Sequence, residues 1–323
     1  MLAFGPKIQD TLLALCGHAS ITGEEGPLCD ALEELLHRFV GKTRCLRVDN
    51  NLLVELITDQ SLPRLILAGH LDTVKAAHAE PPRIADGRVF GAGASDMKAG
   101  LAIMLHLLQE ALSGVSRRYN LQIIFYSGEE GPYLENKLHE VFEAFGDRLR
   151  GAHGAICLEP SDNELQCGCL GGFHARVTFA GKSCHSARPW QGRNAIFTAL
   201  PFLQRLEQRV PAHADIDGLR YTSVLVPTQV SANLEKGRRN SVPAEFMVNV
   251  NGRVRPDQTF EEVLAELERL VAGEGTIEVV DQFSSAPTLV GHELAQSLLA
   301  AGARGPAAKG AYTDVSIFAK HGI

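Results

Sequence analysis

A histidine and an aspartate follow a short apolar run in the segment LILAGHLDTV, residues 65–74. His70 and Asp72 stand two positions apart, so in an extended segment their side chains point to the same face. A carboxylate beside a histidine typically holds one ring nitrogen and leaves the other able to bind a metal ion. Alternatively, the two side chains form an ordinary hydrogen bond in the protein core and bind no metal ion.

A glycine-rich segment, GAGASDMKAG at residues 91–100, carries a second carboxylate. Glycine and other small residues permit a tight loop and a close approach of the backbone. We expect Ser95 to cap the following helix and Asp96 to lie in its first turn, where the helix dipole favours a negative charge. A cap with an aspartate beside it, and no further role, explains the same pattern.

Two more acidic segments follow apolar runs. SGEEG places Glu129 and Glu130 side by side after residues 121–126, and AICLEP places Glu159 after residues 155–158. Adjacent carboxylates repel each other unless a cation is present or one is protonated, so one could bind a metal ion while the other moves a proton. A solvated acidic turn and a surface glutamate are the alternatives.

The four segments share a position just beyond an apolar run or within a glycine loop. Ligands of open α/β sheets gather outside the carboxyl ends of the strands. One imidazole with several carboxylates suits a hydrolytic pair of zinc ions bridged by a carboxylate. Cobalt or manganese could occupy similar ligands.

The first half of the chain alternates helical and strand patterns. Apolar strands between amphipathic helices predict an α/β domain whose mostly parallel sheet has helices on both faces. We expect helices at residues 6–16, 27–40 and 97–112 and strands at 52–58, 65–69, 121–126 and 155–158.

The pattern changes after GCLGG, residues 168–172. FHARVTFAGK alternates strictly, as a half-exposed strand does. The order that follows is β-α-β-β-α-β, a ferredoxin-like unit. We therefore predict a discontinuous catalytic domain, residues 1–171 and 284–323, with an inserted domain at 172–283. The expected elements of the insert after its first strand are a helix at 194–208, strands at 221–233 and 245–254, a helix at 259–272 and a strand at 276–280.

Bulk properties exclude several classes of protein. The chain has 323 residues and a formal net charge of −7, without a basic patch for nucleic acid. We expect no signal peptide and no membrane span, because no basic n-region or long apolar run occurs. Seven irregularly spaced cysteines fit reduced thiols in a cytoplasmic protein. GAGASD imitates a dinucleotide-binding loop, but Asp96 replaces its third glycine, which argues against an oxidoreductase.

The ordered motifs GHLDTV, GASDMKAG, SGEEG and LEP resemble the zinc-dependent amidohydrolase and exopeptidase family that includes acetylornithine deacetylase and succinyl-diaminopimelate desuccinylase. The resemblance covers essentially the whole chain. CHSARPWQGRNA and AYTDV are most similar to the actinobacterial-type desuccinylase branch. The resemblance implies a dinuclear-zinc aminopeptidase-like catalytic domain and an inserted lid and dimerisation domain.

The same resemblance implies roles for the acidic residues. Asp96 would bridge two zinc ions, with His70 and Glu159 as further ligands of one ion and Glu130 as a ligand of the other. Asp72 would orient His70. Glu129 would be the general base that activates the attacking water and then protonates the leaving amine.

In the inserted domain, His185 matches a histidine that stabilises the oxyanion, and Asn240 and Arg253 match residues that bind the substrate carboxylate. His185 also suits a simple turn. Alternation along residues 245–254 puts Asn249, Asn251 and Arg253 on one face, together with Arg255 beyond it. An arginine fork suits a carboxylate, although Arg255 also suits an ordinary surface position. The implied partner is a second copy, bound through residues 172–283.

The resemblance predicts hydrolysis of N-succinyl-LL-2,6-diaminopimelate in lysine and diaminopimelate synthesis. Deacylation of acetylornithine or another N-acyl amino acid is one alternative, and dipeptidase or carboxypeptidase activity is another. The family's C-terminal zinc-binding histidine has no match before Ile323, and His321 does not take its role. We therefore expect a C-terminal truncation and an incomplete second zinc site, which leaves an inactive or non-catalytic fragment as a further alternative.

Overall fold

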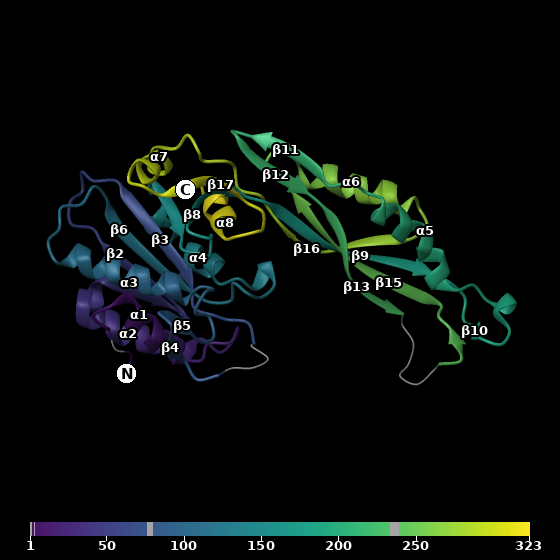
Figure 1. Ribbon diagram of the computed structural model, residues 1–323, viewed down its shortest axis with the longest axis horizontal. Helices are drawn as coiled ribbons and strands as arrows, with labels where there is room; N and C mark the ends of the chain where they lie inside the picture. The colour runs from purple at the N-terminus through teal and green to yellow at the C-terminus, as the bar shows by residue number, and fades with distance from the viewer. Residues whose placement is uncertain (1, 3, 76–79, 233–238) are drawn as a thin grey trace. The chain divides into compact units, whose positions relative to one another are not determined.

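The computed structural model describes residues 2, 4–75, 80–232 and 239–323. It divides into two compact units, one of Met1–Asn163 with Ile317–Ile323 and one of Glu164–Ser316 (Figure 1). The predicted insert at 172–283 falls within the second unit, which also takes in its flanking residues. The domain boundaries at 171/172 and 283/284 stay a prediction.

The first unit contains a five-stranded mixed sheet. Strand β3 pairs in parallel with β6 and with β7, whereas β2 pairs antiparallel with β6 and with β1. The predicted α/β class is confirmed, and the parallel part is limited to the three strands on one side. The strand order is β1 (Cys45–Val48), β2 (Asn51–Leu56), β6 (Asn120–Tyr126), β3 (Arg64–His70) and β7 (Gly154–Cys157).

Helices cover both faces of this sheet, which explains the continuous apolar runs of its strands. Ile66 and Ala68 of β3 pack in one core with helices α4 and α8. The neighbouring Gly69 faces α3 instead, where a Cβ atom would lie 2.6 Å from Met97 Cε. The helices of the unit are α1 (Ile8–Cys16), α2 (Gly26–Val40), α3 (Lys98–Leu112), α4 (Leu138–Leu149) and α8 (Val315–Lys320), with short turns η1 (Lys42–Arg44) and η2 (Tyr133–Glu135) and the hairpin β4 (Arg83–Ala85) and β5 (Arg88–Phe90) (Figure 1).

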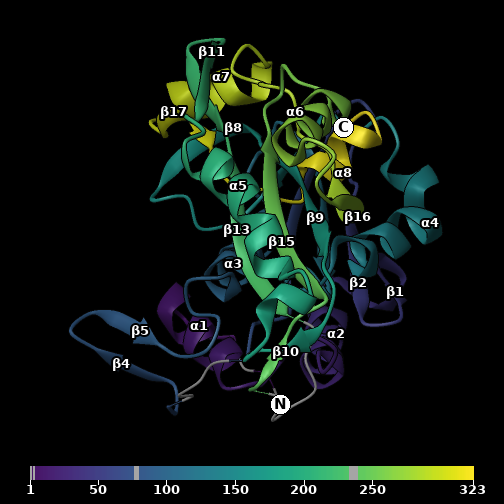
Figure 2. The same ribbon diagram turned by 90° about the vertical axis from the view of Figure 1, so that its right-hand side faces the viewer.

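The second unit is built on a four-stranded antiparallel sheet. Its order is β13-β15-β9-β16, and helices α5 and α6 lie side by side on one face of it (Figure 2). This is the predicted β-α-β-β-α-β arrangement. The elements are β9 (Gly171–Ala180), α5 (Ala195–Glu207), β13 (Leu225–Ala232), β15 (Glu245–Val254), α6 (Phe260–Val271) and β16 (Thr276–Phe283).

Alternation and capping explain these elements. Phe173, Ala175, Val177 and Phe179 of β9 are buried under the helices, while the alternate residues 174, 176 and 178 face away. Helix α6 begins with a capping box, in which Thr259 and Glu262 satisfy each other's backbone N–H groups. The predicted strand at 221–233 is divided between β12 (Leu219–Ser223) and β13, and Asn233 lies outside the described residues.

Shorter elements complete the second unit. Strand β12 forms a hairpin with β11 (Ala212–Ile216), β8 (Glu164–Cys169) pairs in parallel with β17 (Arg304–Lys309), and β10 (Cys184–His185) pairs with β14 (Ser241–Val242). Helix α7 spans Glu293–Ala300, and η3 spans Pro189–Gln191. None of the seven cysteines forms a disulfide. Among the described residues, no helix has the length and apolar character to cross a membrane.

Candidate metal centre

His70 is the last residue of β3 and is fully buried. Its Nδ1 lies 3.0 Å from the backbone oxygen of Asp72 and 3.4 Å from the Asp72 carboxylate. A carbonyl oxygen only accepts hydrogen bonds, so Nδ1 carries the proton of the neutral ring. The lone pair of Nε2 is therefore available to bind a cation.

Three carboxylates surround His70 Nε2. The nearest oxygens of Asp96, Glu159 and Glu129 lie at 3.2, 3.6 and 3.9 Å. Two ligands of a tetrahedral zinc ion, each about 2.0–2.1 Å from the metal, lie about 3.3 Å apart. The distances from His70 Nε2 to Asp96 and to Glu159 are each close to this value, and Glu129 lies farther out.

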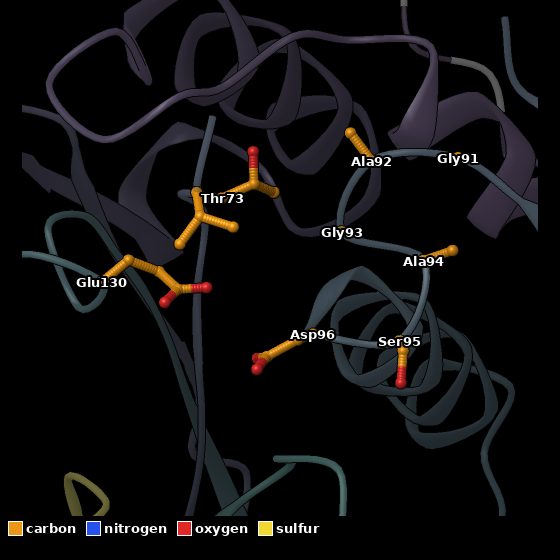
Figure 3. Close-up of a pocket in the computed structure, with 9 residues that line it drawn as sticks. Thr73, Gly91, Ala92, Gly93, Ala94, Ser95, Asp96 and Glu130 are labelled. Carbon is orange, nitrogen blue, oxygen red and sulfur yellow. The ribbon is translucent and has the colours of Figure 1, made fainter. Parts of the chain in front are cut away.

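Glu130 extends the cluster on the side of Asp96. Ligand atoms of His70, Asp96 and Glu130 all lie within 4.8 Å of one another. Figure 3 shows the Asp96 and Glu130 carboxylates pointing toward each other across a pocket of about 380 Å³, which is lined by Thr73, Val74 and residues 91–95. Burial and the neighbouring Asp96 raise the pKa of Glu130. A cation between the two carboxylates would relieve this repulsion.

Asp72 holds the turn that carries the two glutamates. Its carboxylate accepts hydrogen bonds from the backbone N–H groups of Glu129 at 3.1 Å and Glu130 at 3.0 Å. Thr22 Oγ1 donates a third bond at 3.1 Å. Burial acts to raise the pKa of Asp72, but the contacts with His70 and the two N–H groups outweigh it and leave the pKa lowered. Asp72 therefore stays ionised and joins the end of β3 to the glutamate turn.

The expected helix cap at Ser95 is wrong. Helix α3 begins at Lys98, and Met97 stands at its N-cap position without a side-chain cap. Gly93 adopts a positive φ of 72° and accepts a hydrogen bond from the Lys98 N–H group at 2.9 Å. This turn places Asp96 just before the helix rather than in its first turn, with its side chain half exposed.

The second unit brings His185 and Asn240 together, because β10 pairs with β14 and the Ser186 N–H group donates to the Asn240 oxygen at 2.9 Å. The backbone N–H of Ala187 donates to His185 Nδ1 at 3.1 Å. Since a backbone N–H only donates, Nδ1 is the acceptor and Nε2 carries the proton of the neutral ring. His185 thus presents an N–H donor from an exposed position.

Arg253 lies near the end of β15, with its guanidinium 5.6 Å from the centre of the Phe283 ring. Its Nη1 is buried and has no hydrogen-bond partner among the described residues. Burial lowers the pKa of Arg253. Arg255 differs, because it follows the end of the strand and forms two hydrogen bonds with Asp257, at 2.8 and 3.1 Å.

Asn249 and Asn251 do share a face of β15. Both side-chain amides contact the ring of His174, at 3.2 and 3.0 Å.

Thr22 contributes to the candidate metal centre through its hydrogen bond to Asp72. The sequence did not reveal this role, because Thr22 lies 50 residues from Asp72 and belongs to no motif.

Comparison with known proteins places this geometry in a family. Residues 66–323 match the profile of peptidase family M20/M25/M40. A succinyl-diaminopimelate desuccinylase from Corynebacterium glutamicum is 30% identical over 311 residues, which are 94% of this chain and 83% of that protein. A succinyl-diaminopimelate desuccinylase from Alkalilimnicola ehrlichii is 29% identical over 248 residues, which are 72% of this chain and 64% of that protein.

Solved structures agree on the fold. A tripeptidase from Staphylococcus aureus superposes with a TM-score of 0.77 at 20% identity, covering 98% of this chain and 87% of that one. An M20 family metallo-carboxypeptidase from Sulfolobus solfataricus also has a TM-score of 0.77, at 15% identity, covering 99% and 90%. The family match over residues 66–323, and the 30% identity to the Corynebacterium glutamicum protein, show that this chain belongs to peptidase family M20/M25/M40.

Proposed function

We propose that this protein is a metal-dependent amidohydrolase that converts N-succinyl-LL-2,6-diaminopimelate to succinate and LL-2,6-diaminopimelate. The observation that carries the proposal is the convergence of His70, Asp96 and Glu130, whose ligand atoms all lie within 4.8 Å of one another, with Glu159 3.6 Å from His70 Nε2. The names of the relatives from Corynebacterium glutamicum and Alkalilimnicola ehrlichii support the choice of substrate.

Two metal ions are proposed, with zinc as the ion and cobalt or manganese as substitutes. His70, Asp96 and Glu159 would hold one ion, and Asp96 and Glu130 would hold the other, so that Asp96 bridges the pair. The donor set of one imidazole and three carboxylates fits divalent cations. With two proposed ligands against three, the second ion should bind more weakly. When bound, the ions supply Lewis-acid activation of the amide carbonyl and of water.

Glu129 is the proposed general base. Its backbone N–H is held by Asp72, and its carboxylate lies 3.9 Å from His70 Nε2. Glu129 is not part of the group His70, Asp96 and Glu130, whose ligand atoms lie within 4.8 Å of one another. Glu129 takes a proton from the attacking water as a C–O bond forms at the carbonyl carbon. When the C–N bond breaks, the same carboxylic acid gives this proton to the leaving nitrogen.

Residues of the second unit are proposed to bind the substrate. His185 offers an Nε2–H donor for the oxyanion, because its Nδ1 is occupied as an acceptor. Arg253 is proposed to bind a substrate carboxylate, with Asn240 as a further contact. The absence of a carboxylate partner for Arg253 among the described residues supports this role.

The test is metal analysis of the purified chain followed by assays with succinyl-diaminopimelate, acetylornithine and dipeptides. We expect bound zinc and the highest kcat/KM with succinyl-diaminopimelate. Preference for acetylornithine or for dipeptides would replace the substrate assignment by one of the alternatives. A chain with no stoichiometric metal and no hydrolysis would be a non-catalytic member of the family.

We also propose a homodimer formed through α5 and the edge strand β13. Phe197 and Leu200 of α5 are 70% and 47% exposed, and Val230 of β13 is 61% exposed. Because β13 is an edge strand, its outer N–H and C=O groups are able to pair with a second copy.

A cytoplasmic location is also proposed. It is supported by the seven cysteines, none of which forms a disulfide.

A further inference from the structure

Asn51 is a buried polar residue that joins β2 to the turn carrying the two glutamates. It is fully buried at the first position of β2. Its Oδ1 accepts hydrogen bonds from the Ser127 N–H group at 2.9 Å and from the Ser127 hydroxyl at 3.2 Å. Its Nδ2 donates to the backbone oxygen of Val48 at 3.0 Å. The side chain therefore connects the end of β1 to the residue that follows β6.

The turn from Ser127 to Glu130 is fixed from both ends. Asn51 holds Ser127 at its start, and Asp72 holds the two glutamate N–H groups at its end. Between them, Gly128 has a positive φ of 76°, and a Cβ atom there would lie 3.1 Å from a backbone oxygen. The turn consequently has little freedom to move while both side chains stay in place.

We propose that Asn51 is a positioning residue for the metal centre: through Ser127 it sets where Glu129 and Glu130 stand relative to His70. This inference rests on the proposed function, which gives these glutamates their roles. Loss of the Asn51 side chain would remove the acceptor of the buried Ser127 N–H and hydroxyl groups and one donor to the Val48 carbonyl. The turn would shift to satisfy them, and the glutamates would shift with it. Residues that orient metal ligands affect metal affinity strongly.

The chain offers a matched control at the start of β6, the strand that Ser127 follows. Asn120 begins β6 and is 1% exposed. Its Oδ1 accepts from the N–H groups of Thr58 and Asp59, and its Nδ2 donates to the oxygens of Asp59 and Leu62. It therefore makes four bonds, against three for Asn51. Six residues of β6 separate Asn120 from Ser127, a distance of about 23 Å.

The experiment compares Asn51→Ala with Asn120→Ala in the full chain. Zinc affinity is measured by competition with a chromophoric chelator, and amide exchange of residues 127–131 is measured on the metal-free protein. We expect Asn51→Ala to weaken zinc binding at least about 10-fold and to speed this exchange. Asn120→Ala should lower the melting temperature as much or more while leaving both readouts unchanged.

Equal effects of the two substitutions on zinc affinity and on exchange would overturn the inference. Should the unaltered chain bind no zinc, the proposed function fails, but the exchange of residues 127–131 still decides the role of Asn51. If Asn51→Ala does not fold, Ser127→Ala removes only the hydroxyl bond to Asn51. A smaller weakening of zinc binding is expected from it, and an unchanged affinity would contradict the proposal.

Discussion

Glu129 and Glu130 are adjacent in the chain, yet their surroundings give them different tasks. Glu130 faces Asp96 across the pocket (Figure 3). The Glu129 carboxylate lies 3.9 Å from His70 Nε2. Glu129→Gln should keep the zinc content and lower kcat by about 10²–10⁴-fold, because the amide cannot accept a proton. Glu130→Gln should lower the zinc content instead. Turnover and elemental analysis of both variants check this, and a Glu129→Gln enzyme with a near-normal rate would remove Glu129 as the base.

Arg253 and Arg255 provide a second contrast between residues. Arg255 already has Asp257 as its partner, whereas Arg253 Nη1 has none among the described residues. Arg253→Ala should raise KM for succinyl-diaminopimelate at least about 10-fold, because a charge-assisted pair with the substrate is lost, while zinc content is unchanged. Arg255→Ala is the control and should leave KM as it was. Equal KM values for both variants would argue against carboxylate binding by Arg253.

At the residue scale, the sequence predicted which side chains come together at the candidate metal centre. It did not predict the residues whose hydrogen bonds hold them in position. His70, Asp96, Glu130 and Glu159 follow recognisable segments, and the structure brings them together. The contacts of Thr22 and Asn51 leave no local pattern, because each spans 50 or more residues. Residue type alone predicts a helix cap at Ser95. The turn at Gly93 instead starts the helix later, at Lys98.

At the scale of elements, an ion pair joins the end of α5 to α6. Arg209 contacts the Glu266 carboxylate with two nitrogens, at 2.7 and 3.0 Å, and the Arg209 side chain is 7% exposed. The hydrogen bonds from Arg209 hold the pKa of Glu266 below its usual value. A carboxylate with a lowered pKa stabilises the fold above its unfolded pKa of about 4.3 and loses this contribution as the pH falls through the folded value.

Glu266→Gln should therefore lower the free energy of unfolding by about 0.5–1 kcal/mol at pH 7, and the difference should shrink below about pH 4. Glu278→Gln is the comparison, because the pair of Glu278 with Arg176 is more exposed and should contribute less. Urea denaturation at several pH values measures both. A Glu266→Gln effect that grows as the pH falls would contradict the stated sign.

Local sequence patterns predicted the types of most elements. They did not predict the direction in which strands pair or the shortest strands. Alternating burial along β9 and β15 is a local property of period two, so both strands were predictable. The antiparallel pairing of β2 with β6 depends on the path of the chain between them, which no window of sequence records. The hairpin of β4 and β5 has only three residues in each strand, too few to establish a period.

At the scale of the whole molecule, the proposed dimer depends on exposed apolar side chains of α5 and β13. Phe197 of α5 is 70% exposed, and α5 packs on the sheet whose edge strand is β13. Burying apolar surface contributes about 25 cal/mol per Å², so a contact centred on this ring favours association. A charge at the same position would have to be desolvated and would oppose it.

Phe197→Glu should therefore shift the chain from dimer to monomer, as measured by sedimentation velocity at micromolar concentration. Val210→Glu is a matched control, since Val210 is 78% exposed but lies outside both α5 and β13. It should leave the sedimentation coefficient unchanged. A monomeric unaltered chain, or equal dimer content in both variants, would refute association through α5 and β13. Because residues 70–159 supply the proposed metal ligands, monomers of Phe197→Glu should still bind zinc, which separates loss of assembly from loss of fold.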